Sequence, residues 1–234
     1  MSKLVKRTVF LGHNPFAWLM HTLRAKGPVR VFKLIWHASL DVLWDFRHGT
    51  DTLKRIPPEE IQTDSINKVS SQAYGATRAR PFAQLLNQLG LPKESVFVDF
   101  GSGKGRALLI AAQYGFRKVI GVEFSEPLCQ VARKNLETFR SSRKITSEVL
   151  VVHADVVQHV VQPDETVFYF FDPFSAHVLE QVIDNIRQSL GTHPRRIWII
   201  YNSPKHFEII ERSGQFTRIQ NGEIGGSEIR VYQN

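Results

Sequence analysis

The stretch Val98-Asp99-Phe100-Gly101-Ser102-Gly103-Lys104-Gly105 stands where a run of apolar residues gives way to a helical pattern, and it decides the fold. Glycines at such a point let the backbone turn sharply and approach a ligand. The start of a helix adds unpaired amide hydrogens and the positive end of the helix dipole. The stretch therefore predicts a ligand-binding turn at the carboxyl end of a β-strand.

Three classes of ligand use a turn of this kind, and the spacing separates them. A triphosphate-binding loop is excluded, because Val98 stands where its first glycine is needed and Gly105 where its hydroxyl is needed. A dinucleotide turn needs a small residue where Arg106 stands, which disfavours an NAD(P)-dependent oxidoreductase but leaves it as an alternative. The third form, Asp-x-Gly-x-Gly-x-Gly, suits S-adenosylmethionine, since Asp99 can meet the ammonium of its methionine part.

The pattern around the turn predicts an α/β fold with a Rossmann-like, mostly parallel sheet of seven strands. Continuous apolar runs alternate with helical segments, as in parallel sheets covered on both faces. The last two runs are joined by so short a turn, with Asn221-Gly222 and Gly225-Gly226 as turn residues, that they must form an antiparallel hairpin. The expected strands are 95–100, 118–123, 149–153, 166–171, 196–201, 216–220 and 228–232, and the expected helices are 82–89, 104–115, 126–140, 175–190 and 204–212.

Further polar residues follow the ends of the predicted strands, where ligands bind in open α/β sheets. Glu123 ends the second strand and is expected to accept hydrogen bonds from the ribose hydroxyls. Asp155 follows the third strand and is expected to accept from the adenine amino group, to cap a helix, or both. Asp172-Pro173-Phe174 follows the fourth strand and should stand beside the transferred methyl group, with Asp172 orienting or partly deprotonating the acceptor and Phe174 shaping its pocket.

Methyl transfer is an in-line displacement that needs alignment more than acid, base or metal chemistry. We therefore expect no metal site; the histidines show no ligand spacing. The lone Cys129 lies in a helical pattern and is interpreted as a small buried apolar residue in a protein of a reducing compartment, which favours the cytoplasm.

The N-terminal part differs from the rest of the chain in its charge. Seven basic residues and no acidic one occupy positions 1–40, which contribute +7 of the net charge of +8. Helices are predicted over 15–26 and 29–46, the second with an apolar stripe of Val29, Phe32, Trp36, Leu40 and Leu43. The stripe needs a cover, which could be the catalytic domain, the first helix, an acceptor site under a lid or an anionic membrane surface. A transit segment is a further alternative.

The predicted organisation is a basic helical appendage over 1–46, a linker loop over 47–73 and a catalytic domain over 74–234. From about 74 to 232 the chain resembles the class I S-adenosylmethionine-dependent methyltransferases. The motifs Asp99-Phe-Gly-Ser-Gly-Lys-Gly and Gly121-Val-Glu123 are similar to those of little-characterised bacterial methyltransferase-like proteins and of the non-SET histone-lysine methyltransferases. The stretch 45–52, Asp-Phe-Arg-His-Gly-Thr-Asp-Thr, and the segment 74–77 also look like the bacterial set.

The resemblance implies further roles for single residues. It implies that Gly101 and Gly103 shape the cofactor turn and that Tyr74 and Thr77 approach the methionine end of S-adenosylmethionine. Asp172-Pro173-Phe174 resembles a shortened Asn/Asp-Pro-Pro-Tyr/Phe motif of amino-directed methyltransferases, with the second proline missing. The acceptor stays open among a protein lysine, a small metabolite, a lipid or glycan and RNA. A non-catalytic module that binds S-adenosylmethionine and docks through its basic N-terminal segment is the other alternative.

Overall fold

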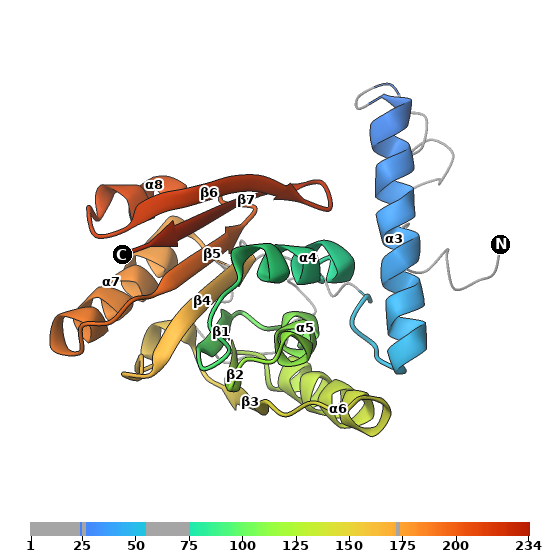
Figure 1. The fold of residues 1–234 in the computed structure, drawn as a ribbon, viewed down its shortest axis with the longest axis horizontal. Coiled ribbons are helices and arrows are strands. Elements are labelled where there is room, and N and C mark those ends of the chain that lie inside the picture. The colour runs from blue at the N-terminus through green and yellow to red at the C-terminus, as the bar shows by residue number, and fades with distance from the viewer. Residues whose placement is uncertain (1–23, 25–26, 55–74, 172–173) are drawn as a thin grey trace.

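The computed structural model describes residues 24, 27–54, 75–171 and 174–234, and Figure 1 shows their arrangement. Tyr74, Asp172, most of the expected linker and all but residue 24 of the expected helix over 15–26 lie outside the described residues. The helices are α3 (Pro28–His48), α4 (Ala79–Leu89), α5 (Arg106–Tyr114), α6 (Glu126–Ser142), α7 (Ala176–Thr192), α8 (Phe207–Arg212) and the 3-10 turn η3 (Val156–Gln158). The strands are β1 (Val96–Phe100), β2 (Lys118–Glu123), β3 (Glu148–His153), β4 (Glu165–Phe171), β5 (Trp198–Asn202), β6 (Thr217–Ile224) and β7 (Ser227–Gln233).

The seven strands form one sheet in the order β3-β2-β1-β4-β5-β7-β6 (Figure 1). The pairs β1–β2, β1–β4, β2–β3 and β4–β5 are parallel, whereas β7 pairs antiparallel with both β5 and β6. The predicted Rossmann-like sheet with its antiparallel C-terminal hairpin is confirmed. Because β1, β2 and β4 run in the same direction, their carboxyl ends meet at one edge of the sheet.

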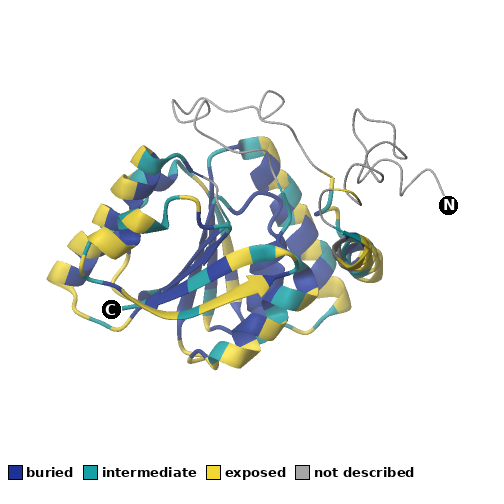
Figure 2. Ribbon diagram, turned by 90° about the horizontal axis from the view of Figure 1, so that it is seen from above, coloured by how far each residue is buried: buried dark blue, intermediate teal, exposed yellow. Residues whose placement is uncertain are grey.

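Helices cover both faces of the central strands, which explains why β1 is buried at every position and β4 at most positions. One cluster packs α4, α5 and part of α6 on one face and contains Phe82, Phe97 and Tyr169. The other packs α7 and α8 on the opposite face and contains Phe100, Phe168 and Phe170. Figure 2 shows the central strands as a buried layer between the two groups of helices, whereas the edge strand β6 is mostly exposed. This core holds the carboxyl edge of the sheet in place.

The helix α3 packs against α4 and α6, but with the face opposite to its apolar stripe. Asp41, Asp45 and His48 are buried, while Phe32 and Trp36 are 67% and 52% exposed. The helix thus packs on the domain that holds the sheet, which is one of the expected alternatives, but not through the apolar stripe. The physical reason is the buried Arg106, described below, which draws carboxylates inward.

The hairpin also departs from expectation at one turn. Asn221 and Gly222 are not turn residues, because they lie within β6 and pair with β7. The chain reverses at Gly225 and Gly226, whose φ angles are 56° and 95°. Positive φ at both central residues is what a tight hairpin turn requires, so this glycine pair determines the register.

No helix in the described part of the chain is long and apolar enough to cross a membrane.

Candidate cofactor site

The glycine turn leaves β1 at the carboxyl edge of the sheet and enters α5. Gly101 and Gly103 have φ angles of 82° and 53°, a region that favours glycine. The amides of Gly101 and Ser102 both donate to the carbonyl of Val122 in β2, at 2.8 and 3.1 Å. The turn is thus fastened to the neighbouring strand before any ligand binds.

Ser102 lies close to the backbone of β2 at Gly121. A Cβ built on Gly121 would stand 2.6 Å from Ser102 Oγ and 2.6 Å from Leu108 Cδ1. Real Cβ atoms essentially never show contacts below 3.0 Å. Glycine at position 121 is therefore what lets the turn lie flat on β2.

Glu123, at the end of β2, holds the turn from the other side. Its Oε2 accepts a hydrogen bond from the Gly103 amide at 2.8 Å and its Oε1 accepts one from the Ser125 amide at 3.0 Å. The residue is 3% exposed. Burial raises the pKa of Glu123, and the amides that donate to the carboxylate act against that rise. The Phe124 amide is a third donor to this carboxylate, which has about four lone-pair sites, so capacity remains for a ligand hydroxyl.

Asp99, the fourth residue of β1, is a second buried carboxyl group at this edge. Burial, and next the nearby charge of Glu123, raise the pKa of Asp99 well above its ordinary value. Among the described residues, none donates a hydrogen bond to its carboxylate. Two neighbouring buried carboxyl groups, one of which has no donor among the described residues, favour a cationic ligand.

Asp155 lies one strand further along the same edge. The Ala154 amide donates to the carbonyl of Glu123 at 3.0 Å, which brings the end of β3 beside the end of β2. The Asp155 carboxylate accepts a hydrogen bond from the Val157 amide at 3.1 Å and caps η3. The expected capping role of Asp155 is thus present, and its contact with adenine remains a prediction.

The predicted acceptor residues follow β4. Phe174 is buried, and its ring packs edge-on against Phe170 with centroids 6.2 Å apart. Asp172 directly precedes Pro173 in the sequence and, like Tyr74, lies outside the described residues. The structure therefore brings Asp99, Gly101, Gly103, Glu123 and Asp155 to one edge of the sheet.

Two side chains at this edge were not predicted as site residues. Asn202 Nδ2 donates to Tyr169 Oη at 3.1 Å, and Tyr169 Oη lies 2.8 Å from Thr77 Oγ1. Either hydroxyl can donate in the Thr77–Tyr169 bond, because the Tyr169 oxygen can accept from Asn202 and still donate or accept a second hydrogen bond. These two hydrogen bonds connect the segment before α4 to β4 and β5. The only available signal was the polarity of Tyr169 and Asn202 within apolar strands.

No group of three or more His, Cys, Asp or Glu side chains in the described ranges is arranged to hold a metal ion.

Part of the chain matches a known protein family. Residues 55–149, which include the glycine turn and both buried carboxyl groups, match the model of the family described as "Histone methylation protein DOT1". A curated relative from Caenorhabditis elegans, "Histone-lysine N-methyltransferase, H3 lysine-79 specific", is 24% identical over 106 residues. The match covers 36% of this chain and 11% of that relative, so the chain spans only a small part of the relative's length.

Solved structures resemble about two thirds of the chain. A SAM-dependent methyltransferase from Aquifex aeolicus superposes with a TM-score of 0.53 at 13% identity, over 66% of this chain and 88% of that chain. Magnesium protoporphyrin IX methyltransferase from Synechocystis PCC 6803, solved with bound SAM, superposes with a TM-score of 0.50 at 18% identity, over 65% of this chain and 76% of that chain. The likeness is one of fold.

Proposed function

We propose that this chain, which has the Rossmann-like fold of the class I methyltransferases, transfers the methyl group of S-adenosylmethionine to a nitrogen or oxygen acceptor. The single observation that carries the proposal is the pair of buried carboxyl groups, Asp99 and Glu123, on either side of the glycine turn. The match of residues 55–149 to a methylation family supports it.

The chemistry of these residues fits S-adenosylmethionine part by part. The Asp99 carboxylate would accept from the methionine ammonium, and a positive charge there would offset the desolvation that raises the pKa of Asp99. Glu123 would accept from the ribose hydroxyls through its remaining lone pairs, while it continues to hold the Gly103 amide. Asp155 would face the adenine amino group, and Tyr74 the methionine end.

A pyrophosphate would fit the same edge poorly. The two phosphates of a dinucleotide carry negative charge, and the Asp99 carboxylate would oppose them in a medium that screens charge weakly. An NAD(P)-dependent oxidoreductase is therefore the weaker candidate.

The bound cofactor supplies an electrophilic methyl group on a sulfonium centre. The chain's part in the reaction is to hold an acceptor in line with that methyl group and to exclude water. We propose that Asp172 orients the acceptor and receives a hydrogen bond or a proton from it, and that Phe174 shapes the acceptor pocket. Asp172→Ala should lower turnover by about 10²-fold and change S-adenosylhomocysteine affinity only a few-fold, as expected for a positioned polar group.

The experiment that tests the function is transfer of a labelled methyl group. The full chain is incubated with labelled S-adenosylmethionine and a cell extract separated into protein, nucleic-acid, lipid and small-molecule fractions. The proposal expects one fraction to gain label with the wild-type protein and about 10²-fold less with Asp172→Ala. Absence of label from every fraction, together with tight cofactor binding, would instead support the non-catalytic module.

We also propose that the N-terminal segment contacts an anionic membrane surface. Val29, Phe32, Ile35 and Trp36 project from α3 as exposed apolar side chains, and the first 40 residues of the sequence carry seven basic residues and no acidic one. The full chain should sediment with phosphatidylserine vesicles and much less with phosphatidylcholine vesicles. Phe32→Ser with Trp36→Ser should abolish the difference, whereas Val160→Ser, at another exposed apolar residue, should not.

A further inference from the structure

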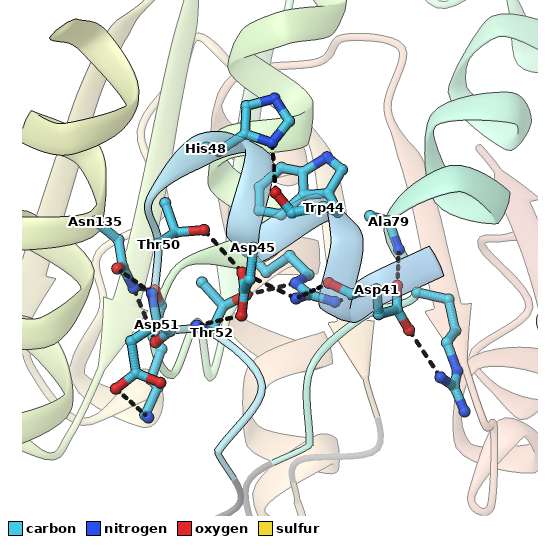
Figure 3. Close-up of polar contacts among 12 residues, drawn as sticks. Asp41, Trp44, Asp45, His48, Thr50, Asp51, Thr52, Ala79 and Asn135 are labelled. Atoms are coloured by element: carbon cyan, nitrogen blue, oxygen red, sulfur yellow. Dashed lines mark hydrogen bonds and ion pairs between the residues drawn. The ribbon is translucent and has the colours of Figure 1, made fainter. Parts of the chain in front are cut away.

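The start of α5 is surrounded by six charged side chains that come from distant parts of the sequence. Asp41, Asp45 and Asp51 are acidic, and Arg78, Lys104 and Arg106 are basic, so the charges balance. The three acids belong to residues 41–52, a stretch that covers the end of α3 and the loop after it and that we call the clasp (Figure 3).

Arg106, the first residue of α5, is 1% exposed. Its Nη2 lies 3.0 Å from Asp45 Oδ1, its Nη1 lies 3.1 Å from Asp41 Oδ1, and its Nε donates to Thr52 Oγ1 at 2.5 Å. The guanidinium also lies over the Trp44 ring, 5.1 Å from its centroid. A buried guanidinium without partners is strongly unfavourable, so Arg106 requires the clasp in place.

The Asp45 carboxylate in turn fixes the loop of the clasp. Its Oδ1 accepts from the hydroxyls of Thr50 and Thr52, each at 2.7 Å, and its Oδ2 accepts from the Thr52 amide at 2.9 Å. The ion pair with Arg106 is therefore the centre of a network and not an isolated contact. Loss of the carboxylate charge would leave both the loop and Arg106 less well held.

A second connection reaches the cofactor turn itself. Lys104, within the turn, is 1% exposed, and its Nζ donates to Asp51 Oδ2 at 3.2 Å. Asn135 of α6 donates to the carbonyls of Lys104 and Asp51 at 3.0 and 3.2 Å and accepts from the Asp51 amide at 2.9 Å. The Asn135 side chain thus joins the backbone of the turn to that of the clasp, and Figure 3 shows its contact with Asp51.

The other end of the clasp holds α4. Asp41 Oδ1 accepts from the Ala79 amide at 3.1 Å, and Asp41 Oδ2 accepts from Arg78 Nη1 at 2.7 Å. A carboxylate at the first turn of a helix satisfies free amides and complements the helix dipole. The same carboxylate therefore faces the starts of both α4 and α5.

We propose that Asp45 and Arg106 are positioning residues for the cofactor, which act through the glycine turn without touching the ligand. The clasp holds the first residue of α5 and the Lys104 backbone, and these fix where the Gly101–Gly105 amides point. The N-terminal helix is then part of the cofactor site. The proposal rests on the proposed function for the identity of the ligand, but the claim that the clasp holds the glycine turn applies to the protein without ligand.

The test is hydrogen–deuterium exchange on the full chain without ligand, with Asp45→Asn as the variant. Asparagine keeps the size of aspartate but removes the charge and replaces one oxygen by an NH2 group. The ion pair with Arg106 is therefore lost, and an NH2 donor would face the Thr52 amide, which is also a donor. We expect amides in peptides covering 101–107 to exchange at least about tenfold faster, while peptides of β5 and β7 keep their rates. Asp164→Asn breaks the exposed Arg117–Asp164 pair, whose side chains are 52% and 51% exposed, and should change neither region.

Titration with S-adenosylhomocysteine separates the two proposals. Asp45→Asn should raise the Kd about 10- to 100-fold, and Arg106→Lys should recover part of the loss seen with Arg106→Met. If the exchange rates at 101–107 are the same in Asp45→Asn and the wild type, the proposed role of the clasp is refuted, whether or not the ligand binds. Faster exchange with no binding by the wild-type protein supports the clasp and contradicts the proposed cofactor.

A milder variant covers the case in which Asp45→Asn does not fold. Asp51→Asn alters a side chain that is 64% exposed and removes only the Lys104 pair. It should increase exchange at 101–107 by a smaller factor of about threefold. A loss of stability spread evenly over all peptides would mean that the clasp is merely structural, and would refute the proposal.

Discussion

Gly121→Ala should disturb the cofactor turn without touching any ligand. The new Cβ would lie 2.6 Å from Ser102 Oγ and 2.8 Å from Ser102 Cβ, so Ser102 would have to move by about 0.4 Å to reach the 3.0 Å limit of real contacts. Ser102 stands between Gly101 and Gly103, whose amides are bonded to Val122 and Glu123, so the turn cannot move freely. Overpacking of this kind costs about 1–3 kcal/mol.

The cost should appear in both stability and affinity. For a chain of this size, about 1–3 kcal/mol corresponds to a fall in Tm of roughly 2–12 °C. If the strain acts on the ligand-binding form of the turn, S-adenosylhomocysteine affinity should fall about 5- to 150-fold. Calorimetric titration and a thermal melt measure the two effects.

A matched control is available in α7. Gly191 is exposed, and nothing lies within 4 Å of a Cβ built on it. Gly191→Ala should leave affinity unchanged and stabilise the protein by up to about 1 kcal/mol. Wild-type melting and wild-type affinity in Gly121→Ala would refute the account of how the turn packs on β2.

Three further predictions follow from single side chains. Burial and the charge of Glu123 raise the pKa of Asp99, so in the folded protein its carboxyl group keeps a proton above the ordinary value of 3.8. The stability that this proton contributes is lost as pH rises through the raised pKa. The ammonium of S-adenosylhomocysteine favours ionised Asp99, so the ligand should bind up to about tenfold tighter per pH unit in that window. Calorimetric titrations across pH should show this slope in the wild type and none in Asp99→Asn. Arg106→Met leaves the buried Asp45 carboxylate without its counter-ion, while Asp41 keeps Arg78, and should lower the free energy of unfolding in urea by about 3–5 kcal/mol, against less than about 1 kcal/mol for the exposed Arg117→Met; equal losses would contradict it. Burial raises the pKa of Cys129 from 9.0 to about 12, so at pH 8 the native thiol should react with iodoacetamide about 10³-fold more slowly than in urea, and rapid native labelling would contradict this.

The sequence predicted the parts of the fold that depend on local patterns. The range of β2 agrees with the expected range residue by residue, and the other expected strand ranges overlap the observed ones. Asp99 and Glu123 could be placed because each ends or nearly ends a buried strand, and parallel strands bring such residues to the same edge. The chemistry of the turn was likewise local, since glycine spacing and one preceding acid are visible in the sequence.

What the sequence did not predict depends on contacts between distant segments. The apolar stripe of α3 suggested the wrong buried face, because periodicity cannot show that Arg106, 61 residues beyond Asp45, would need carboxylates. The acidic pair Asp41 and Asp45, spaced by one helical turn, was the available signal. The bonds of Tyr169 to Thr77 and Asn202 likewise need the tertiary structure, and Asn221-Gly222 has turn chemistry that cross-strand pairing overrides.

The most direct test of the central claim is calorimetric titration of the full chain with S-adenosylhomocysteine, in parallel with NADH. We expect saturable binding of one S-adenosylhomocysteine per chain and no binding of NADH. Glu123→Gln should raise the Kd for S-adenosylhomocysteine at least about tenfold, since hydrogen bonds to a charged group contribute about 1.5–3 kcal/mol. Binding of NADH without binding of S-adenosylhomocysteine would contradict the account.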